Sequence, residues 1–303
     1  MKDIIKIATR KSPLALAQAA LVESIICKNI KTLLMPMTSS GDTMNAADFK
    51  NHGGKGLFLK ELELSLLNRE ADIAVHSLKD VPAVLDDSFE VITIGGRENP
   101  SDVLLSRKYN NIKELPLDAK IGTSSPRRIS MLRNISEDYN IVSIRGNIQT
   151  RLKKMDDEKM DGIILAAAGL TRMSLDKNIT EYIPRDIFVP SAGQGVICIE
   201  YLKDNYLIKK LIEKYCLKDI ERCAAEERQF VRTIGGDCMS PIGAHAYIKN
   251  KILHLQGYVG SINAKKYIKS KIEGGIESVG IGNKLANIFI KQGAHEILRE
   301  RSK

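Results

Sequence analysis

The sequence of 303 residues contains no tryptophan, and only 5% of its residues are aromatic. Proteins that bind single-stranded nucleic acids stack bases on aromatic side chains, and the sequence also shows no helix-turn-helix, zinc-finger or RNA-recognition pattern. We therefore expect no nucleic-acid partner. No apolar run approaches the roughly 18 uninterrupted residues that a membrane span needs, so we also expect no membrane partner.

The chain has five cysteines, an odd number, and they lack the paired short spacings of a disulfide framework or a zinc site. The five histidines are also scattered, so we predict no metal site. Residues 1–11 carry scattered charge instead of the apolar core of a signal peptide. These absences favour a cytoplasmic protein.

Basic residues are in excess: 46 Lys and Arg stand against 37 Asp and Glu, which gives a net charge of +9. Such an excess favours an anionic partner, whether phosphate, polycarboxylate or nucleic acid, and the charge alone does not choose between them. The length is typical of two or three domains, and the composition is that of a globular protein.

The chain opens with a strand, a loop and a helix. Residues 4–9 alternate as in a strand, and Ser12 then supplies a helix N-cap in front of the apolar pattern of residues 14–26. Arg10 lies in the loop beside the helix N-terminus, where unpaired N–H groups and the helix dipole favour anions.

This pattern returns later in the chain. Residues 120–126 (KIGTSSP) resemble residues 6–13 (KIATRKSP), and residues 161–169 parallel residues 72–77. An internal repeat of this kind predicts two α/β domains of one design. Turn-rich segments near 95–101 and 188–196, the second read as a hinge strand, would connect them and enclose a cleft that opens and closes.

The composition changes from about residue 220, where the pattern predicts a small α+β domain. Its predicted elements are an amphipathic helix over 223–233, strands over 243–248, 252–259 and 266–272, and one closing helix over 283–299. Cys238 lies in a glycine-rich loop between the first helix and the first strand. The predicted boundaries are 1–97 with 192–216 for domain 1, 98–191 for domain 2 and 217–303 for domain 3.

The stretch that carries most chemistry is residues 71–82 (ADIAVHSLKDVP). We interpret residues 73–75 as a buried strand, His76 and Ser77 as its polar rim, and Lys79 and Asp80 as loop residues at its carboxyl end. A carboxylate in that position can exchange protons. The alternative is a turn carboxylate that pairs with Lys79.

A glycine-rich loop, residues 53–56 (GGKG), resembles a phosphate loop but fails the Walker spacing, because Gly56 follows the lysine instead of Ser or Thr. We interpret it as a flexible loop whose Lys55 can reach into a cleft. A solvated glycine turn explains the composition equally well.

Arginines recur where predicted strands pass into helices. Residues 141–144 form a strand pattern that ends at Arg145, and Asn147 can cap a helix that carries Arg151 one turn in. The carboxyl ends of strands are the ligand edge of open α/β sheets, and arginine's planar fork suits carboxylates and phosphates. The full set is Arg10, Arg127, Arg128, Arg145, Arg151 and Arg172.

Six motifs, in order along the chain, resemble those of the hydroxymethylbilane synthase family, also called porphobilinogen deaminases. They are residues 7–16 (IATRKSPLAL), 53–62 (GGKGLFLKEL), 76–82 (HSLKDVP), 122–128 (GTSSPRR), 145–151 (RGNIQTR) and 235–241 (GGDCMSP). The resemblance implies two domains like type II periplasmic binding proteins plus a C-terminal domain. It also implies assembly of four porphobilinogens into a linear tetrapyrrole with loss of ammonia, by a monomer.

The resemblance further implies a dipyrromethane cofactor joined to Cys238 by a thioether, with Asp80 as the catalytic carboxylate. By the same pattern, the cofactor would be bound by Cys238, Lys79, Asp80, Ser125, Arg127, Arg128, Arg145 and Gly146. The substrate and growing chain would be bound by Arg10, Ser12, Lys55, Phe58, Arg151, Arg172 and Gln194.

The chemistry of the residues agrees with this resemblance. Each pyrrole of the product carries an acetate and a propionate, which arginines can match, and one carboxylate can act first as proton donor and then as counter-ion. Two alternatives stay open: a short-form phosphoribosyltransferase, whose glycine- and threonine-rich phosphate loop we do not find, and a non-catalytic anion-binding module.

Overall fold

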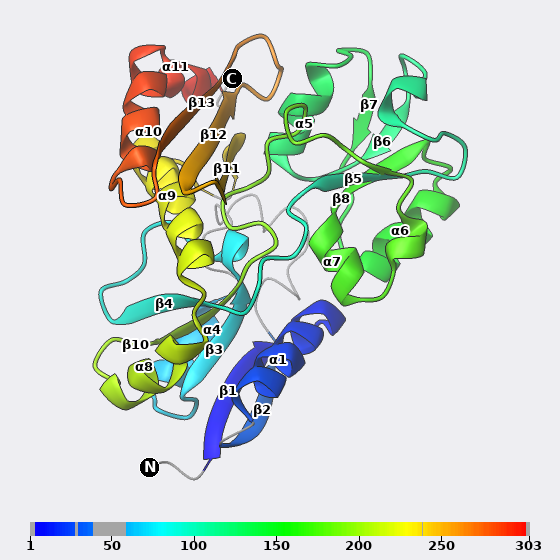
Figure 1. Ribbon diagram of the computed structural model, residues 1–303. Helices are drawn as coiled ribbons and strands as arrows, with labels where there is room; N and C mark the ends of the chain where they lie inside the picture. Colours follow the sequence, from blue (N-terminus) through cyan, green and yellow to red (C-terminus); the bar gives the residue numbers. More distant parts are fainter. Residues whose placement is uncertain (1–3, 28–29, 39–58, 238, 301–303) are drawn as a thin grey trace. The chain divides into compact units, whose positions relative to one another are not determined.

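The computed structural model describes residues 4–27, 30–38, 59–237 and 239–300 (Figure 1). The chain divides into two compact units. The first comprises Met1–Arg97 and Val196–Ala224, and the second comprises Glu98–Gly195 and Ala225–Lys303. The chain therefore leaves the first unit after Arg97 and returns to it at Val196.

The first unit is built on a five-stranded sheet of order β2-β1-β3-β10-β4 (Figure 1). β1 is parallel to β2 and β3, whereas β10 is antiparallel to β3 and β4. Its strands are β1 (Ile4–Arg10), β2 (Lys31–Met37), β3 (Ile73–Ser77), β4 (Phe89–Ile94) and β10 (Ile197–Leu202). Its helices are α1 (Pro13–Ile26), α4 (Lys60–Leu67) and α8 (Tyr206–Ile212).

Alternation along β3 gives this sheet two buried faces. Ile73 and Val75 pack with residues of α1, while Ala74 packs with Leu62 and Leu66 of α4. Because successive side chains of a strand point to opposite faces, α1 and α4 cover opposite sides of the sheet. The short apolar run of β3 is thus buried throughout, and the chain becomes polar where the strand ends.

The second unit repeats the arrangement with a sheet of order β7-β6-β8-β5-β9. β6 is parallel to β7 and β8, and β5 is antiparallel to β8 and β9. The strands are β5 (Asp102–Leu105), β6 (Lys120–Gly122), β7 (Asn140–Val142), β8 (Gly162–Ala166) and β9 (Glu181–Tyr182). The helices are α5 (Pro126–Arg133), α6 (Ile148–Asp157) and α7 (Ala167–Arg172).

The predicted internal repeat is confirmed down to single hydrogen bonds. The Asp72 carboxylate accepts from the N–H of Lys6 at 3.0 Å, and the Asp161 carboxylate accepts from the N–H of Lys120 at 2.9 Å. Each acid directly precedes the third strand in its sheet order and binds the N–H of one residue near the start of a neighbouring parallel strand.

A third sheet follows near the C-terminus, with antiparallel strands in the order β11-β12-β13. Its elements are α9 (Lys218–Ile234), β11 (Ile242–Lys249), β12 (Ile252–Gly260), β13 (Tyr267–Gly275), α10 (Ile281–Lys291) and α11 (Ala294–Arg299). Short 3-10 turns span Leu78–Asp80, Ile112–Glu114, Asp176–Asn178 and Glu213–Tyr215.

The predicted fold class, two α/β domains of the binding-protein type plus a small α+β domain, is confirmed.

Three local predictions were wrong. The closing helix is interrupted at Gly293, whose φ of 92° separates α10 from α11. The expected hinge strand over 188–196 is a turn, because Gly193 and Gly195 adopt positive φ values of 73° and 88°, and the strand begins only at Ile197. The predicted loop at Asp80 is a turn of 3-10 helix.

Across the helices that the described ranges contain, none is long and apolar enough to span a membrane.

Candidate active site

A small pocket lies in the first unit where β1 and β3 end and α1 begins. Its polar lining includes Arg10, Ser12, Gln18, His76, Ser77 and Asp80. Three of these residues, Arg10, Ser12 and Asp80, were predicted for the site from the sequence. The structure therefore brings a cation, a helix cap and a carboxylate together at the carboxyl edge of this sheet.

The backbone around Asp80 is held on both sides. Leu78 is buried, and its N–H donates to the carbonyl of Val196 at 3.0 Å. The N–H of Val81 closes the turn on the carbonyl of Leu78 at 3.1 Å. Asp80 itself is exposed, whereas Lys79 is half-buried. A fixed backbone with an exposed carboxylate allows proton exchange with solvent and a bound molecule.

The N-terminus of α1 forms another part of the pocket wall. Ser12 caps the helix, and its hydroxyl accepts from the N–H of Ala15 at 3.3 Å. Farther along α1, the Gln18 amide donates to the Ser77 hydroxyl at 2.7 Å. Pro13 at the first helical position fits the predicted start.

Beside the pocket lies a buried cluster of ionisable groups. His76 Nε2 and Glu200 Oε2 are 3.0 Å apart, and both side chains are almost completely buried. Glu63 of α4 belongs to the same cluster: burial raises its pKa to about 6, and the charge of Glu200 adds to that effect. Sequence reasoning identified His76 as a rim residue but missed Glu63 and Glu200.

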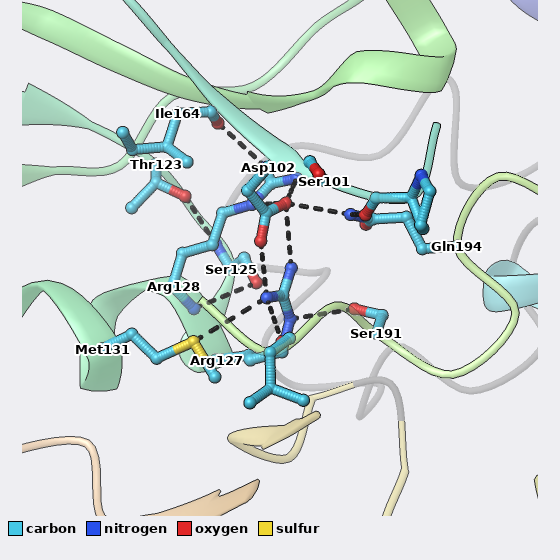
Figure 2. Close-up of polar contacts among 12 residues, drawn as sticks. Ser101, Asp102, Thr123, Ser125, Arg127, Arg128, Met131, Ile164, Ser191 and Gln194 are labelled. Atoms are coloured by element: carbon cyan, nitrogen blue, oxygen red, sulfur yellow. Dashed lines mark hydrogen bonds and ion pairs between the residues drawn. The ribbon is translucent and has the colours of Figure 1, made fainter. Parts of the chain in front are cut away.

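In the second unit the predicted arginines at the start of α5 converge on Asp102, the first residue of β5 (Figure 2). Arg127 donates through Nη1 to Asp102 Oδ2 at 2.6 Å and through Nη2 to Oδ1 at 3.1 Å. Arg128 donates to Oδ1 through Nε at 3.1 Å and Nη2 at 2.8 Å. We call Asp102, Arg127, Arg128 and Gln194 the Asp102 cluster.

Gln194 completes this cluster from the turn before β10. Its amide nitrogen donates to the carbonyl of Pro100 at 2.6 Å and to Asp102 Oδ1 at 3.1 Å. Burial alone would raise the pKa of Asp102, but the charges of Arg127 and Arg128, with hydrogen bonds from Arg127 and Gln194, hold it well below its usual range. Asp102 is therefore a stable anion.

Neighbouring loops carry the other predicted residues of this unit. Ser125 caps α5, and Ser124 donates to the carbonyl of Ile144 at 2.7 Å, which joins the loops after β6 and β7. Arg145 is half-buried in the second of these loops. Arg151, also half-buried, donates through Nε to the carbonyl of Gly146 at 2.8 Å.

Gly146 has a conformational reason to be glycine. Its φ is 110°, and a Cβ atom there would lie 2.7 Å from the Thr150 side chain. Asn147 then caps α6 by accepting from the N–H of Thr150. The Arg-Gly-Asn motif thus produces a tight turn with arginine on one side and a helix N-terminus on the other.

Arg172 ends α7 and donates through Nη2 to the carbonyl of Gly195 at 2.7 Å. Burial lowers its pKa, and Glu98 opposes that shift. The prediction put Arg172 at a strand end; it lies instead at the end of a short helix that follows β8. Its contact is with the same turn that supplies Gln194.

Three predicted residues, Lys55, Phe58 and Cys238, lie outside the described residues. The residue that sequence reasoning missed in the second unit is Asp102. An acid directly before an apolar run (DVLL) was the available signal, since it needs a cationic partner when the strand is buried.

Comparison with known families gives two matches. Residues 5–210 match the family model described as "Porphobilinogen deaminase, dipyromethane cofactor binding domain", and residues 221–291 match "Porphobilinogen deaminase, C-terminal domain". Curated relatives agree. The chain is 43% identical over 307 residues to the porphobilinogen deaminase of Vesicomyosocius okutanii, covering 99% of this chain and all of that one.

A second relative, the porphobilinogen deaminase of Francisella tularensis subsp. novicida, is 43% identical over 301 residues, which cover 98% of this chain and 99% of that one. Similar solved structures include a methionine-binding lipoprotein of Bacillus subtilis, at 15% identity and TM-score 0.43 over 72% of this chain and 92% of that one. The methionine-binding protein MetQ is 12% identical with a TM-score of 0.42, and the match covers 75% of this chain and 95% of that one.

Proposed function

Because the chain belongs to the porphobilinogen deaminase family, we infer that the protein is a hydroxymethylbilane synthase, a transferase of porphyrin and heme biosynthesis. It condenses four porphobilinogen molecules stepwise, with release of ammonia, on a dipyrromethane cofactor, and hydrolysis then gives the linear tetrapyrrole. The observation that carries this inference is the match of residues 5–210 to the family's cofactor-binding domain.

The residues of the second unit fit an anionic pyrrole cofactor. Every pyrrole ring brings an acetate and a propionate, and buried carboxylates need cationic partners with N–H donors. Two arginines and one aspartate meet in the Asp102 cluster, so it carries a net positive charge beside the N-terminus of α5. When bound, the dipyrromethane supplies the free pyrrole position on which the chain is extended.

The proposed chemical role falls on Asp80. It would give a proton to the departing amine of porphobilinogen, and its carboxylate would then face the cation left on that substrate. The exposure of Asp80 and the held backbone of residues 78–81 support this role. Arg10 and Ser12, which line the same pocket, would bind the substrate's carboxylates.

We propose the remaining site residues as predicted from the sequence. Lys79, Ser125, Arg127, Arg128, Arg145 and Gly146 would hold the cofactor with Asp80, and Lys55, Phe58, Arg151, Arg172 and Gln194 would contact substrate or the growing chain. Cys238 would carry the thioether. The described chain leading to residue 238 ends α9 at Ile234, and Gly235 then takes a positive φ of 75°.

We also propose the three domains with boundaries 1–97 with 192–216, 98–191 and 217–303. A monomer located in the cytoplasm, without nucleic-acid or membrane partners, stays a prediction, as does a cleft that opens and closes.

Intact mass of the protein, made in a host that produces porphobilinogen, tests the function and the anchor together. The wild type should exceed its sequence mass by two porphobilinogens less two ammonia molecules, and Cys238→Ala should have the bare mass and no activity. Cys216→Ala, a half-buried thiol in the first unit, serves as the control and should keep the adduct. A wild type without an adduct, or an adduct that survives in Cys238→Ala, would contradict the proposal.

A further inference from the structure

The Asp102 cluster is unusual because two adjacent arginines reach the same carboxylate. Neighbouring residues of a helix point about 100° apart, so Arg127 and Arg128 would ordinarily diverge. Here both guanidiniums bend to Asp102, which is fully buried and accepts from each of them (Figure 2). The carboxylate therefore determines the direction of both side chains.

The charges of this cluster do not cancel. Arg127 is 2% exposed and Arg128 is 6% exposed, and Asp102 is the acid with which both pair among the described residues. One positive charge is left in a buried place. Because an unbalanced buried charge is costly, such a site is stabilised by one further anion.

Both guanidiniums also keep N–H groups for such an anion. An arginine has five N–H donors. Within the described chain, Arg127 uses its donors on Asp102, on the Ser191 hydroxyl at 3.0 Å, on the carbonyl of Val189 at 2.7 Å and on the Met131 sulfur at 3.8 Å. Arg128 bonds Asp102 and the carbonyl of Ile164 at 2.8 Å. Three of the Arg127 contacts share the two N–H groups of Nη1, so one N–H of its Nη2 remains. Arg128 keeps one N–H on Nη1 and one on Nη2.

The same contacts tie the cluster to both segments that connect the units along the chain. Asp102 follows the first connection, and Gln194 precedes the second. The turn that carries Gln194 is held from behind, where the N–H of Gly193 donates to the buried Glu227 carboxylate of α9 at 2.7 Å. Asp102 thus receives hydrogen bonds from α5 and from a turn that is anchored independently.

We propose that Asp102 is a positioning residue of the cofactor site: it aligns the free N–H groups of Arg127 and Arg128 on one carboxylate of the dipyrromethane. Gln194 assists by holding Asp102 Oδ1. Asp102 touches neither cofactor nor substrate in this assignment. It leaves the arginine pair with a single net charge, which one carboxylate neutralises. The proposal rests on the function inferred above.

The test compares Asp102→Asn with Gln194→Met and a matched control. Asp161→Asn is the control, because Asp161 belongs to the same sheet but binds the N–H of Lys120 at the opposite, amino-terminal end of β6. Each protein is made without its cofactor in a host that cannot form porphobilinogen. Porphobilinogen is then added, the rate of adduct formation is followed by intact mass, and the unfolding temperatures of both forms are measured.

The wild type should unfold at a higher temperature with the adduct than without it, because the bound group stabilises only the folded state. Asp102→Asn should form the adduct more than tenfold more slowly and lose most of that temperature difference. Gln194→Met should slow adduct formation several-fold. Asp161→Asn should lower both unfolding temperatures equally and keep the difference between them.

Normal adduct formation with a full temperature difference in Asp102→Asn would overturn the positioning role, as would an equal loss in Asp161→Asn. If Asp102→Asn does not fold, the unfolding temperatures of Gln194→Met decide, because Gln194 is also proposed to contact substrate, and an undiminished difference between the two forms of that variant overturns the proposal. A wild type that takes up no adduct would instead overturn the proposed function itself. The two failures are therefore distinguishable.

Discussion

The two units build the same sheet but bury different charges in it. In the first unit Glu200 of β10 pairs with His76 of β3, whereas in the second Asp102 of β5 pairs with Arg127 and Arg128. In both sheets the acid lies on the antiparallel strand, which is the strand that follows a passage of the chain between units. His76 lies on the parallel strand β3, and Arg127 and Arg128 lie on α5, which follows the parallel strand β6.

This difference separates two chemical tasks. The first unit offers an exposed carboxylate at Asp80, while the second offers a buried cluster with excess positive charge. In the proposed assignment, the shared sheet design carries proton transfer in one unit and anion binding in the other. The same topology permits this because ligand groups sit at the carboxyl ends of strands, outside the packed core.

The largest effect should come from Asp80→Asn, which removes the proposed proton donor from the first unit. Turnover should fall by at least ~10² to 10⁴, the usual contribution of a positioned acid or base. The unfolding temperature should stay near the wild-type value because Asp80 is exposed. Asp86→Asn, an exposed acid of the same unit, is the control and should keep full turnover. Near-normal turnover in Asp80→Asn would contradict the catalytic assignment.

The next effect concerns single lysine replacements in the second unit. Each charge-assisted contact contributes roughly 1.5 to 3 kcal/mol, and lysine lacks arginine's fork, so these variants should stall with partial chains attached. The variants are Arg127→Lys, Arg128→Lys, Arg145→Lys and Arg151→Lys.

Intact mass should reveal the stalled species as a ladder. Arg107→Lys, whose partner Asp156 is partly exposed, is the control in the same unit and should give no ladder. A raised KM without accumulated intermediates would mean that these arginines bind free substrate instead of the cofactor and the chain that grows on it.

A stability measurement can test the buried pair of the first unit. Glu200→Ala should reduce the free energy of unfolding by ~1 to 3 kcal/mol, because it leaves a buried ring nitrogen of His76 without its hydrogen-bond partner. Asp204→Ala removes an acid of the same unit whose side chain and whose partner Arg69 are both exposed, so it should cost much less. If denaturant titrations show equal losses of unfolding free energy in the two variants, burial of the His76–Glu200 pair does not increase its contribution to stability.

The smallest effect is a pH dependence of stability from Glu63. Its pKa rises from 4.5 to about 6 in the folded protein, so the folded state holds this proton more tightly than the unfolded chain does. Its stabilising contribution is therefore complete below pH 4.5 and is lost as the pH rises through 6.

Since Glu63 is only half-buried, the contribution should be no more than about 1 kcal/mol. Denaturant titrations from pH 4 upward should show this decline in the wild type and a flatter curve in Glu63→Gln. Identical pH dependence in the two proteins would contradict the raised pKa.

The repeat, the strands and the ligand edges were predictable because they depend on local patterns. The similarity of residues 6–13 and 120–126 was enough to predict two matching sheets. Ser12, Ser125 and Asn147 cap helices as expected, since a cap needs only its own first turn.

What the sequence could not provide were contacts between distant segments. Arg127 and Arg128 were expected to face a ligand, but their pairing with Asp102 depends on how β5 enters the sheet. Glu200 lies 124 residues from His76, and no local pattern links them. The break at Gly293 was missed because the apolar pattern continues on both sides of it.

The position of β10 also affects the order in which the protein is made. β10 lies between β3 and β4, yet it is synthesised only after all of β5 to β9. Until then β4 lacks its neighbour in the sheet. The first unit therefore begins synthesis first but cannot complete its sheet until β5 to β9 have been made, although domains of nascent chains usually fold in N-terminal order. Ribosome-bound chains stalled just after residues 98–195 have left the ribosome should be protected from protease over residues 98–195 and cleaved within residues 1–97.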